Sequence, residues 1–197
     1  MGFWVSGRSP IIVNPRSCCG ANIGEVTGYL APSGAEIHAF EPDPYAFSRL
    51  KENCGQFENV TFFNQTVGVG ASTLNIYRAA SFGKNPEWNS LMTTSVMDPK
   101  VAEARKMEKI EVECIDLESH LSALIAQGKN IALLKMDIEG AELDVLERLV
   151  QTDILTHIKS TVVEIHPWMF KRQPRDFQKL KAIAKKRKDF NLNLDWY

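Results

Sequence analysis

A glycine turn and two carboxylates stand where the chain could do chemistry, because each follows a predicted strand. The turn is Cys18–Gly24, a few residues after the apolar run 11–13, and Glu41 ends the predicted strand 36–40, about 20 residues after the first glycine. Asp137 ends the mostly apolar run that begins at Ile131. A turn and acid so spaced are typical of a site that binds a nucleotide through its ribose hydroxyls. A second strand-end carboxylate can orient a reacting group or take up a proton.

Other polar residues also follow predicted strands. They are Asn64 to Gly68, the block 137–142 with Glu139 and Glu142, and Glu164 to His166. In a parallel sheet, ligands bind outside the carboxyl ends of the strands. The alternatives are structural: Glu41 as an exposed or capping acid, Asp137 as a helix cap, and Glu142 as a first-turn helix acid, the favoured interpretation for Glu142. For His166, a catalytic and a structural role are equally favoured.

The hydrophobic pattern predicts strands that alternate with helices, which implies a mostly parallel α/β sheet with helices on both faces. Asp43 and Pro44 predict the start of a helix that ends near 53–55. We expect an apolar segment with Val26, Tyr29 and Leu30 after the turn. We expect Val67–Gly70 to form a break between two strands. The predicted strands are 11–13, 36–40, 60–64, 73–77, 110–115, 131–137, 161–167 and 190–197, and further helices begin near 116, 139 and 177.

Composition restricts the class of protein. The chain has 197 residues, 44% hydrophobic and 24% charged, with a net charge of −1. We expect a single domain over 1–197, irregular over about 1–12, with no nucleic-acid or membrane partner and a cytoplasmic location. The four cysteines lack Cys-x-x-Cys spacing, so we expect no metal site. The oligomeric state stays open.

The turn itself excludes two kinds of nucleotide site. It lacks the Gly-Lys-Ser/Thr of a phosphate-binding loop. Asn22 stands where a dinucleotide-binding turn has its second glycine, which disfavours a pyrophosphate. A nucleoside ligand without phosphates fits better, and S-adenosylmethionine is one. A nicotinamide-dependent reductase is a weaker alternative, since the chain has no Tyr-x-x-x-Lys pair to activate a carbonyl.

Several motifs together resemble the FkbM-type methyltransferases. They are Gly20-Ala21-Asn22-Ile23-Gly24, Ala39-Phe40-Glu41-Pro42-Asp43-Pro44, Val67-Gly68, the block Lys135-Met136-Asp137-Ile138-Glu139-Gly140-Ala141-Glu142, and Glu164-Ile165-His166-Pro167. The resemblance covers about residues 18–167, and the block from Lys135 is its most specific part. It implies a Rossmann-like class I fold, S-adenosylmethionine as cofactor and methylation of a hydroxyl on a small-molecule or sugar acceptor.

The resemblance also implies roles for individual residues. Glu41 would bind the ribose hydroxyls and Asp137 would face the reacting end of the cofactor. Asp137 and His166 are the candidate bases. The remaining cofactor-binding residues would be Gly20, Ala21, Asn22, Gly24, Pro42, Gln65 and Val67, and the acceptor side would be formed by Glu139, Glu142 and Glu164. The irregular stretch 79–106 is expected to help form the acceptor pocket.

Two departures from the family pattern keep a second hypothesis open. Cys18 stands where the family usually has an acid, two residues before the first glycine. Asn14-Pro15 falls where the first strand should run, and proline removes a hydrogen-bond donor from a strand. The alternative is a catalytically weak or inactive methyltransferase-fold protein that acts as a binding module.

Overall fold

The computed structural model describes residues 15–84, 86, 93–95, 97–165 and 174–194. The expectations for an irregular start over about 1–12 and for a strand over 11–13 lie outside these residues. The candidate base His166 also lies outside them.

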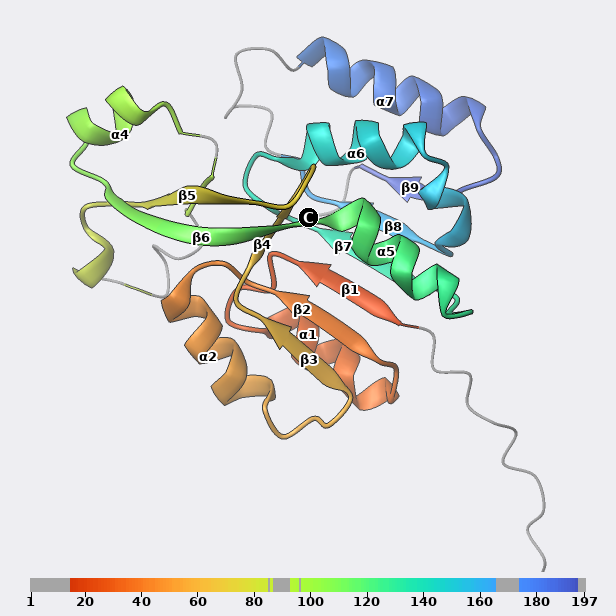
Figure 1. Ribbon diagram of the computed structural model, residues 1–197, viewed down its shortest axis with the longest axis horizontal. Helices are drawn as coiled ribbons and strands as arrows, with labels where there is room; N and C mark the ends of the chain where they lie inside the picture. Colours follow the sequence, from red (N-terminus) through yellow and green to blue (C-terminus); the bar gives the residue numbers. More distant parts are fainter. Residues whose placement is uncertain (1–14, 85, 87–92, 96, 166–173, 195–197) are drawn as a thin grey trace, which may run out of the picture.

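The described chain is built on a sheet of six parallel strands, which confirms the predicted α/β architecture (Figure 1). The strand order is β3-β2-β1-β7-β8-β9. The strands are β1 (Arg16–Cys19), β2 (Ile37–Phe40), β3 (Val60–Phe63), β7 (Leu133–Met136), β8 (Thr161–Val163) and β9 (Leu192–Asn193). The direction of winding reverses between β1 and β7, so this pair marks the topological switch point of the sheet.

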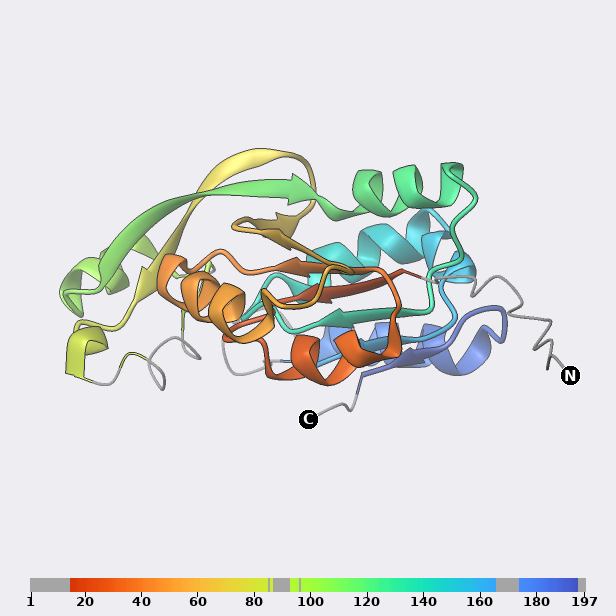
Figure 2. The same ribbon diagram turned by 90° about the horizontal axis from the view of Figure 1, so that it is seen from below.

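Helices cover both faces of this sheet, as predicted (Figure 2). One apolar cluster joins the sheet to the first two helices, and a larger cluster joins its other face to the last three. These helices are α1 (Glu25–Leu30), α2 (Pro44–Cys54), α5 (Leu117–Ala126), α6 (Glu142–Gln151) and α7 (Pro174–Lys186). Shorter elements are α4 (Pro99–Ala104) and the 3₁₀ turns Ala31–Ser33, Phe82–Lys84 and Ile154–His157.

Helix α2 forms as its sequence predicts. The Asp43 carboxylate accepts hydrogen bonds from the N–H groups of Tyr45 and Ala46, and Pro44 occupies the first turn. A carboxylate at this position satisfies N–H groups that have no partner inside the helix, and proline has no N–H to satisfy. The start of α2 at Pro44 therefore comes soon after Glu41 and fixes the direction in which the chain leaves β2.

A second sheet lies beyond the carboxyl edge of the first (Figure 1). It consists of β4 (Thr66–Gly68), β5 (Ser72–Arg78) and β6 (Glu108–Asp116), with β5 antiparallel to β6 and β4 parallel to it. The predicted strands in β5 and β6 are confirmed. The prediction that Val67–Gly70 forms only a break between strands was wrong, because residues 66–68 pair with β6.

Two details near the N-terminal half differ from the sequence prediction. The described first strand begins directly after Pro15, so the proline precedes the ladder, and its carbonyl still accepts a hydrogen bond from Ala132 N–H. Tyr29 is 86% exposed, so it does not belong to the apolar face of α1.

Among the described residues, no helix is both long and apolar enough to cross a membrane.

Candidate functional site

Cys18 and Cys19, predicted as part of the turn, are the last residues of β1, so the glycine turn is Gly20–Gly24. This turn and the acid after β7 meet at the switch point of the sheet. Asp137 N–H donates to the Cys19 carbonyl at 3.1 Å, which continues the ladder of β1 and β7 past the strand ends. Gly20 has a φ of +72°, and a Cβ built on it would lie 1.6 Å from the Asp137 carbonyl oxygen. Only glycine fits between these two segments, so Gly20 is required for their contact.

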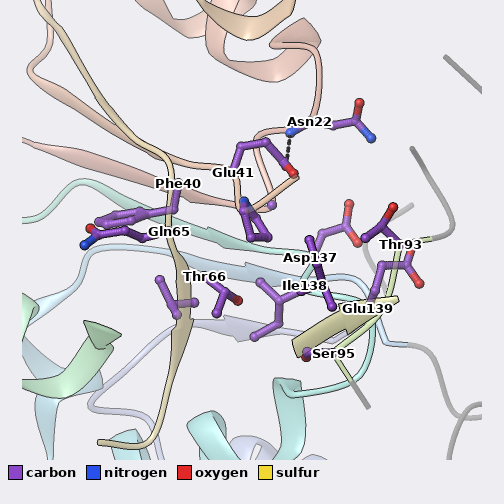
Figure 3. Close-up of a pocket in the computed structure, with 14 residues that line it drawn as sticks. Asn22, Phe40, Glu41, Gln65, Thr66, Thr93, Ser95, Asp137, Ile138 and Glu139 are labelled. Atoms are coloured by element: carbon purple, nitrogen blue, oxygen red, sulfur yellow. Dashed lines mark hydrogen bonds between the residues drawn. The ribbon is translucent and has the colours of Figure 1, made fainter. Parts of the chain in front are cut away.

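A pocket opens at this edge between the two sheets (Figure 3). Of the predicted cofactor and substrate residues, it brings together Gly20, Asn22, Glu41, Pro42, Gln65, Val67, Asp137 and Glu139. These residues come from four separate segments of the chain. The structure therefore gathers residues that the sequence placed only at separate strand ends.

Glu41 is buried against the turn, with 6% of its surface exposed. Its Oε2 accepts a hydrogen bond from Asn22 N–H at 2.8 Å (Figure 3). Its Oε1 accepts one from Asp43 N–H at 2.8 Å. Burial raises the pKa of Glu41 to about 7, although both backbone donors act in the opposite direction. A carboxylate has about four acceptor sites, so the two N–H groups leave capacity for ribose hydroxyls.

Asp137 reaches the pocket from the end of β7. Its Oδ2 lies 3.0 Å from the Lys135 ammonium, and its side chain is 27% exposed. Because α6 begins only at Glu142, Asp137 does not occupy the capping position that was the alternative interpretation. It lines the pocket together with Ile138 and Glu139.

Glu142 was expected on the acceptor side, but it is not among the residues that line the pocket. This residue is fully buried, and its carboxylate accepts hydrogen bonds from the N–H groups of Ile138 at 3.1 Å and Gly140 at 2.9 Å. Glu142 therefore holds the loop that carries Asp137 and Glu139, where Glu139 adopts a φ of +49°. The two N–H groups of the loop need an acceptor, and this need explains why an acid stands at position 142.

Three other predicted residues do not line the pocket. Ala21 is buried and donates its N–H to the Phe40 carbonyl at 2.9 Å. Gly24 has a φ of +96°, and a Cβ there would lie 2.8 Å from the Leu50 side chain, so this glycine serves the packing of α1 on α2. Glu164 N–H donates to the Met136 carbonyl at 2.9 Å, and its side chain is half-buried.

Six lining residues were not named individually as site residues in the sequence prediction, namely Phe40, Thr66, Ile76, Thr93, Ser95 and Ile138. Thr66 and Ile138 lie inside the predicted strand-end segments 64–68 and 137–142, and Phe40 adjoins Glu41. Ile76 carried no comparable signal in the sequence, because it becomes part of the wall only through the pairing of β5 with β6. Thr93 and Ser95 belong to the irregular stretch that was expected to contribute to the acceptor pocket.

The segment 93–95 is fixed by contacts to three parts of the molecule. Thr93 Oγ1 donates to Asp43 Oδ2 at 3.3 Å, and Thr94 Oγ1 donates to the Glu139 carbonyl at 2.7 Å. The backbone of Thr94 also pairs with that of Tyr77 on β5. This wall of the pocket is therefore tied to α2, to the second sheet and to the loop after β7.

The chemistry of the lining suits a ligand that is both positively charged and rich in hydroxyl groups. Glu41, Asp137 and Glu139 supply carboxylates, and no Lys, Arg or His occurs among the described lining residues. Phe40, Ile76, Val67 and Ile138 supply an apolar wall on which a base can pack. Within the part of the chain that the structure describes, no group of three or more His, Cys, Asp or Glu is arranged to hold a metal ion.

Comparisons with known proteins find two curated methyltransferases among the similar sequences. The chain is similar to the 2-O-methyltransferase NoeI of Sinorhizobium fredii, with 29% identity over 117 residues, which cover 57% of this chain and 46% of that protein. It is also similar to the hexuronic acid methyltransferase AglP of Haloferax volcanii, with 28% identity over 170 residues, covering 84% of this chain and 60% of that protein. The chain thus spans about half the length of these curated relatives.

No solved structure matches the chain significantly. The family model of the methyltransferase FkbM domain, in contrast, matches residues 19–191, which include the glycine turn, Glu41 and the whole loop 137–142. The family predicted from the motifs is confirmed, and the Rossmann-like sheet carries those motifs at its carboxyl edge. This chain therefore belongs to the FkbM methyltransferase domain family.

Proposed function

We propose that this chain is an S-adenosylmethionine-dependent methyltransferase that methylates a hydroxyl group of a small molecule or sugar. The observation that carries the proposal is the convergence of Glu41, Asp137 and the Gly20 turn on one pocket at the switch point. Membership of the FkbM family supports methyl transfer. The acids in the pocket suit the positive charge and the ribose hydroxyls of this cofactor.

Different lining residues would contact different parts of the cofactor. Glu41 would accept hydrogen bonds from the ribose hydroxyls, and Gly20 and Asn22 would lie along the methionine part. Gln65 and Val67 would lie beside the adenine, with Phe40 and Ile76 as its apolar support. When bound, the cofactor supplies a methyl group that is already activated on a positively charged sulfur.

The protein's contribution would then be mainly to align an acceptor and to exclude water. Asp137 lines the pocket with a partly exposed side chain, and it is the described candidate for orienting the acceptor hydroxyl or receiving its proton. Glu139, Thr93 and Ser95 offer further polar groups on that side. A role for His166 as base remains a prediction, as does the acceptor-side role of Glu164.

The names of the two relatives favour a sugar acceptor, since one refers to a hexuronic acid and the other to 2-O-methylation. Methyl transfer from an isotope-labelled cofactor to a panel of neutral sugars and hexuronic acids tests this point. We expect label on a hydroxyl oxygen of one sugar class. Label on nitrogen or carbon alone would contradict the assignment as an O-methyltransferase.

Calorimetry with S-adenosylhomocysteine tests cofactor binding directly. We expect binding by the wild type, and a loss of about tenfold or more in Glu41→Gln, because the amide cannot accept both ribose hydroxyls in the same way. Glu36→Gln is the matched control, since Glu36 precedes the same strand at the opposite edge and is bonded to Lys129. If the wild type shows no binding at about millimolar ligand, the proposal fails.

Cys18 is the observation that favours a second candidate, a methyltransferase-fold binding module. It is fully buried in the apolar cluster under α1 and α2, and the resemblance of the motifs implies an acid at this position. Under this alternative, Cys18→Asp should create or sharply tighten cofactor binding. Binding by the wild type at about micromolar ligand would exclude it.

The remaining expectations stay predictions. They are a single domain over residues 1–197, a cytoplasmic location, and function without nucleic-acid or membrane partners. Sedimentation of the purified chain measures the oligomeric state, for which no expectation was formed.

A further inference from the structure

Lys135 is a buried lysine on β7, directly beneath the pocket. Its side chain is 4% exposed. An ammonium group is strongly hydrated in water, so its burial costs free energy unless charged and polar partners replace that water. The contacts of Lys135 therefore indicate why a lysine stands at this position.

Two of these contacts join the two halves of the site. The Lys135 Nζ donates to the Gly20 carbonyl at 2.8 Å and to Asp137 Oδ2 at 3.0 Å. Gly20 follows β1 and Asp137 follows β7, so one ammonium group binds both strand ends at the switch point. The same ammonium charge lowers the pKa of Glu41, although burial has the larger, opposite effect. Lys135 therefore also interacts electrostatically with the acid that follows β2.

The residue that pairs with Lys135 in the neighbouring strand β1 carries no charge. In the parallel ladder of β1 and β7, Lys135 lies opposite Cys18. Burial raises the pKa of the Cys18 thiol, so this neighbour is uncharged at neutral pH. Position 18 therefore offers the ammonium no anionic partner, whereas Asp137 does.

We propose that Lys135 is a positioning residue for methyl transfer, whose buried ammonium fixes the Asp137 carboxylate and the Gly20 carbonyl as one rigid unit. This inference rests on the proposed function, because the unit that it fixes is the proposed cofactor site. Lys135 acts through Asp137 and the turn. An Asp137 side chain held in one orientation loses less conformational entropy when a ligand binds than a freely rotating one.

Lys135→Met tests the proposal, because methionine fills a similar volume without a charge or a donor. We expect S-adenosylhomocysteine binding to weaken about tenfold or more, a loss typical of a disordered binding group. Lys129→Met is the matched control: Lys129 is also paired with a carboxylate, Glu36, but at the amino edge of the strands. The control should bind like the wild type. Lys135→Gln, which keeps a donor but no charge, is measured beside it in case the methionine variant does not fold.

A double-mutant cycle with Asp137→Asn separates positioning from a general loss of stability. If Lys135 acts through Asp137, the double variant should bind about as weakly as Asp137→Asn alone, because Lys135 has no carboxylate left to position in that background. Additive losses in the cycle would overturn the proposal. Equal binding by Lys135→Met and the wild type would also overturn it, while the proposed function would stand.

Hydrogen exchange of the ligand-free protein tests the same unit even if no cofactor binds. We expect faster exchange of the Asp137 and Ala21 amides in Lys135→Met than in Lys129→Met, because these amides form the hydrogen bonds that join the strand ends. Unchanged exchange at both amides would contradict the proposal. Failure of the wild type to bind cofactor would instead count against the proposed function alone.

Discussion

At the scale of single residues, the site depends on a carboxylate that folding makes less acidic. Glu41 is buried beside the turn, and its pKa is raised from 4.5 to about 7. Between these two values the folded protein binds the proton more tightly than the unfolded chain does. The contribution of Glu41 to stability is therefore present at low pH and is lost as the pH rises from about 4.5 to about 7.

His120 on α5 has the opposite effect in nearly the same range. Its Nε2 lies 2.9 Å from the His38 Nδ1, and its pKa is lowered from 6.5 to about 4, first by burial and then by the charges of His38 and Lys129. The unfolded chain binds this proton more tightly. Stability contributed by a neutral His120 is therefore present above 6.5 and is lost as the pH falls to about 4.

The first prediction compares the pH dependence of two variants with the wild type. Relative to Glu41→Gln, wild-type stability should fall by about 3 kcal/mol as the pH rises from 4.5 to 7. Relative to His120→Gln, wild-type stability should rise between pH 4 and 6.5. Urea unfolding at several pH values measures both differences. Two flat difference curves would show that neither pKa is shifted by folding.

The second prediction concerns the close approach at Gly20. Gly20→Ala should destabilise the protein severely and abolish cofactor binding, because its Cβ would overlap the Asp137 carbonyl. Gly34→Ala is the matched control: its φ of +73° is nearly the same, but nothing lies within 4 Å of its Cβ. The control should cost about 1 kcal/mol from backbone strain alone. Thermal denaturation of both variants measures the difference, and equal costs would contradict the argument.

At the scale of elements, a buried ion pair joins the second sheet to the start of α2. The Arg78 guanidinium at the end of β5 donates two hydrogen bonds to the Asp43 carboxylate, at 2.6 and 2.8 Å. Arg78 also lies over the Phe82 ring, with 4.1 Å between its Cζ and the ring centroid. Asp43 meanwhile caps α2 and accepts from Thr93. One carboxylate therefore links α2, the second sheet and the acceptor-side wall of the pocket.

The third prediction is that Arg78→Met destabilises the protein by about 3 kcal/mol, because it leaves the buried Asp43 charge without its cation. Arg148→Met removes the largely exposed pair with Glu118 and should cost less than about 1 kcal/mol. Urea unfolding measures both costs. A loss no greater in Arg78→Met than in Arg148→Met would mean that the backbone donors of α2 suffice to hold Asp43.

At the scale of the whole molecule, the strand order explains why the site lies where it does. The chain winds from β1 to β3 in one direction and from β7 to β9 in the other. Helices on opposite faces therefore leave the sheet on either side of the β1–β7 pair, which opens a crevice at the carboxyl ends of these strands. The second sheet covers this crevice and supplies Val67 and Ile76 to its wall.

The fourth prediction is that a bound nucleoside stabilises the whole fold. S-adenosylhomocysteine at about 100 times its Kd should add about 2.7 kcal/mol and raise Tm by several degrees. NADH should give no comparable shift, because Asn22 replaces the second glycine of a pyrophosphate-binding turn. Thermal denaturation with each ligand measures the effect. A larger shift with NADH would favour the reductase alternative.

The sequence by itself determined the alternation of elements, the limits of α2, and the positions of Glu41 and Asp137 at strand ends. These features follow from local rules: hydrophobic periodicity, the capping preference of Asp43, and the apolar runs that precede each acid. The specific block from Lys135 to Glu142 also allowed the family to be identified from the sequence, as the comparison confirmed.

Only the tertiary structure decided which of these residues face the pocket. It placed Glu142 inside its own loop and Cys18 opposite Lys135, and it brought Ile76 and Thr93 to the pocket wall. These outcomes depend on which strands become neighbours and on which buried N–H groups need an acceptor. Both are set by contacts between residues far apart in the chain, and a local pattern does not encode them.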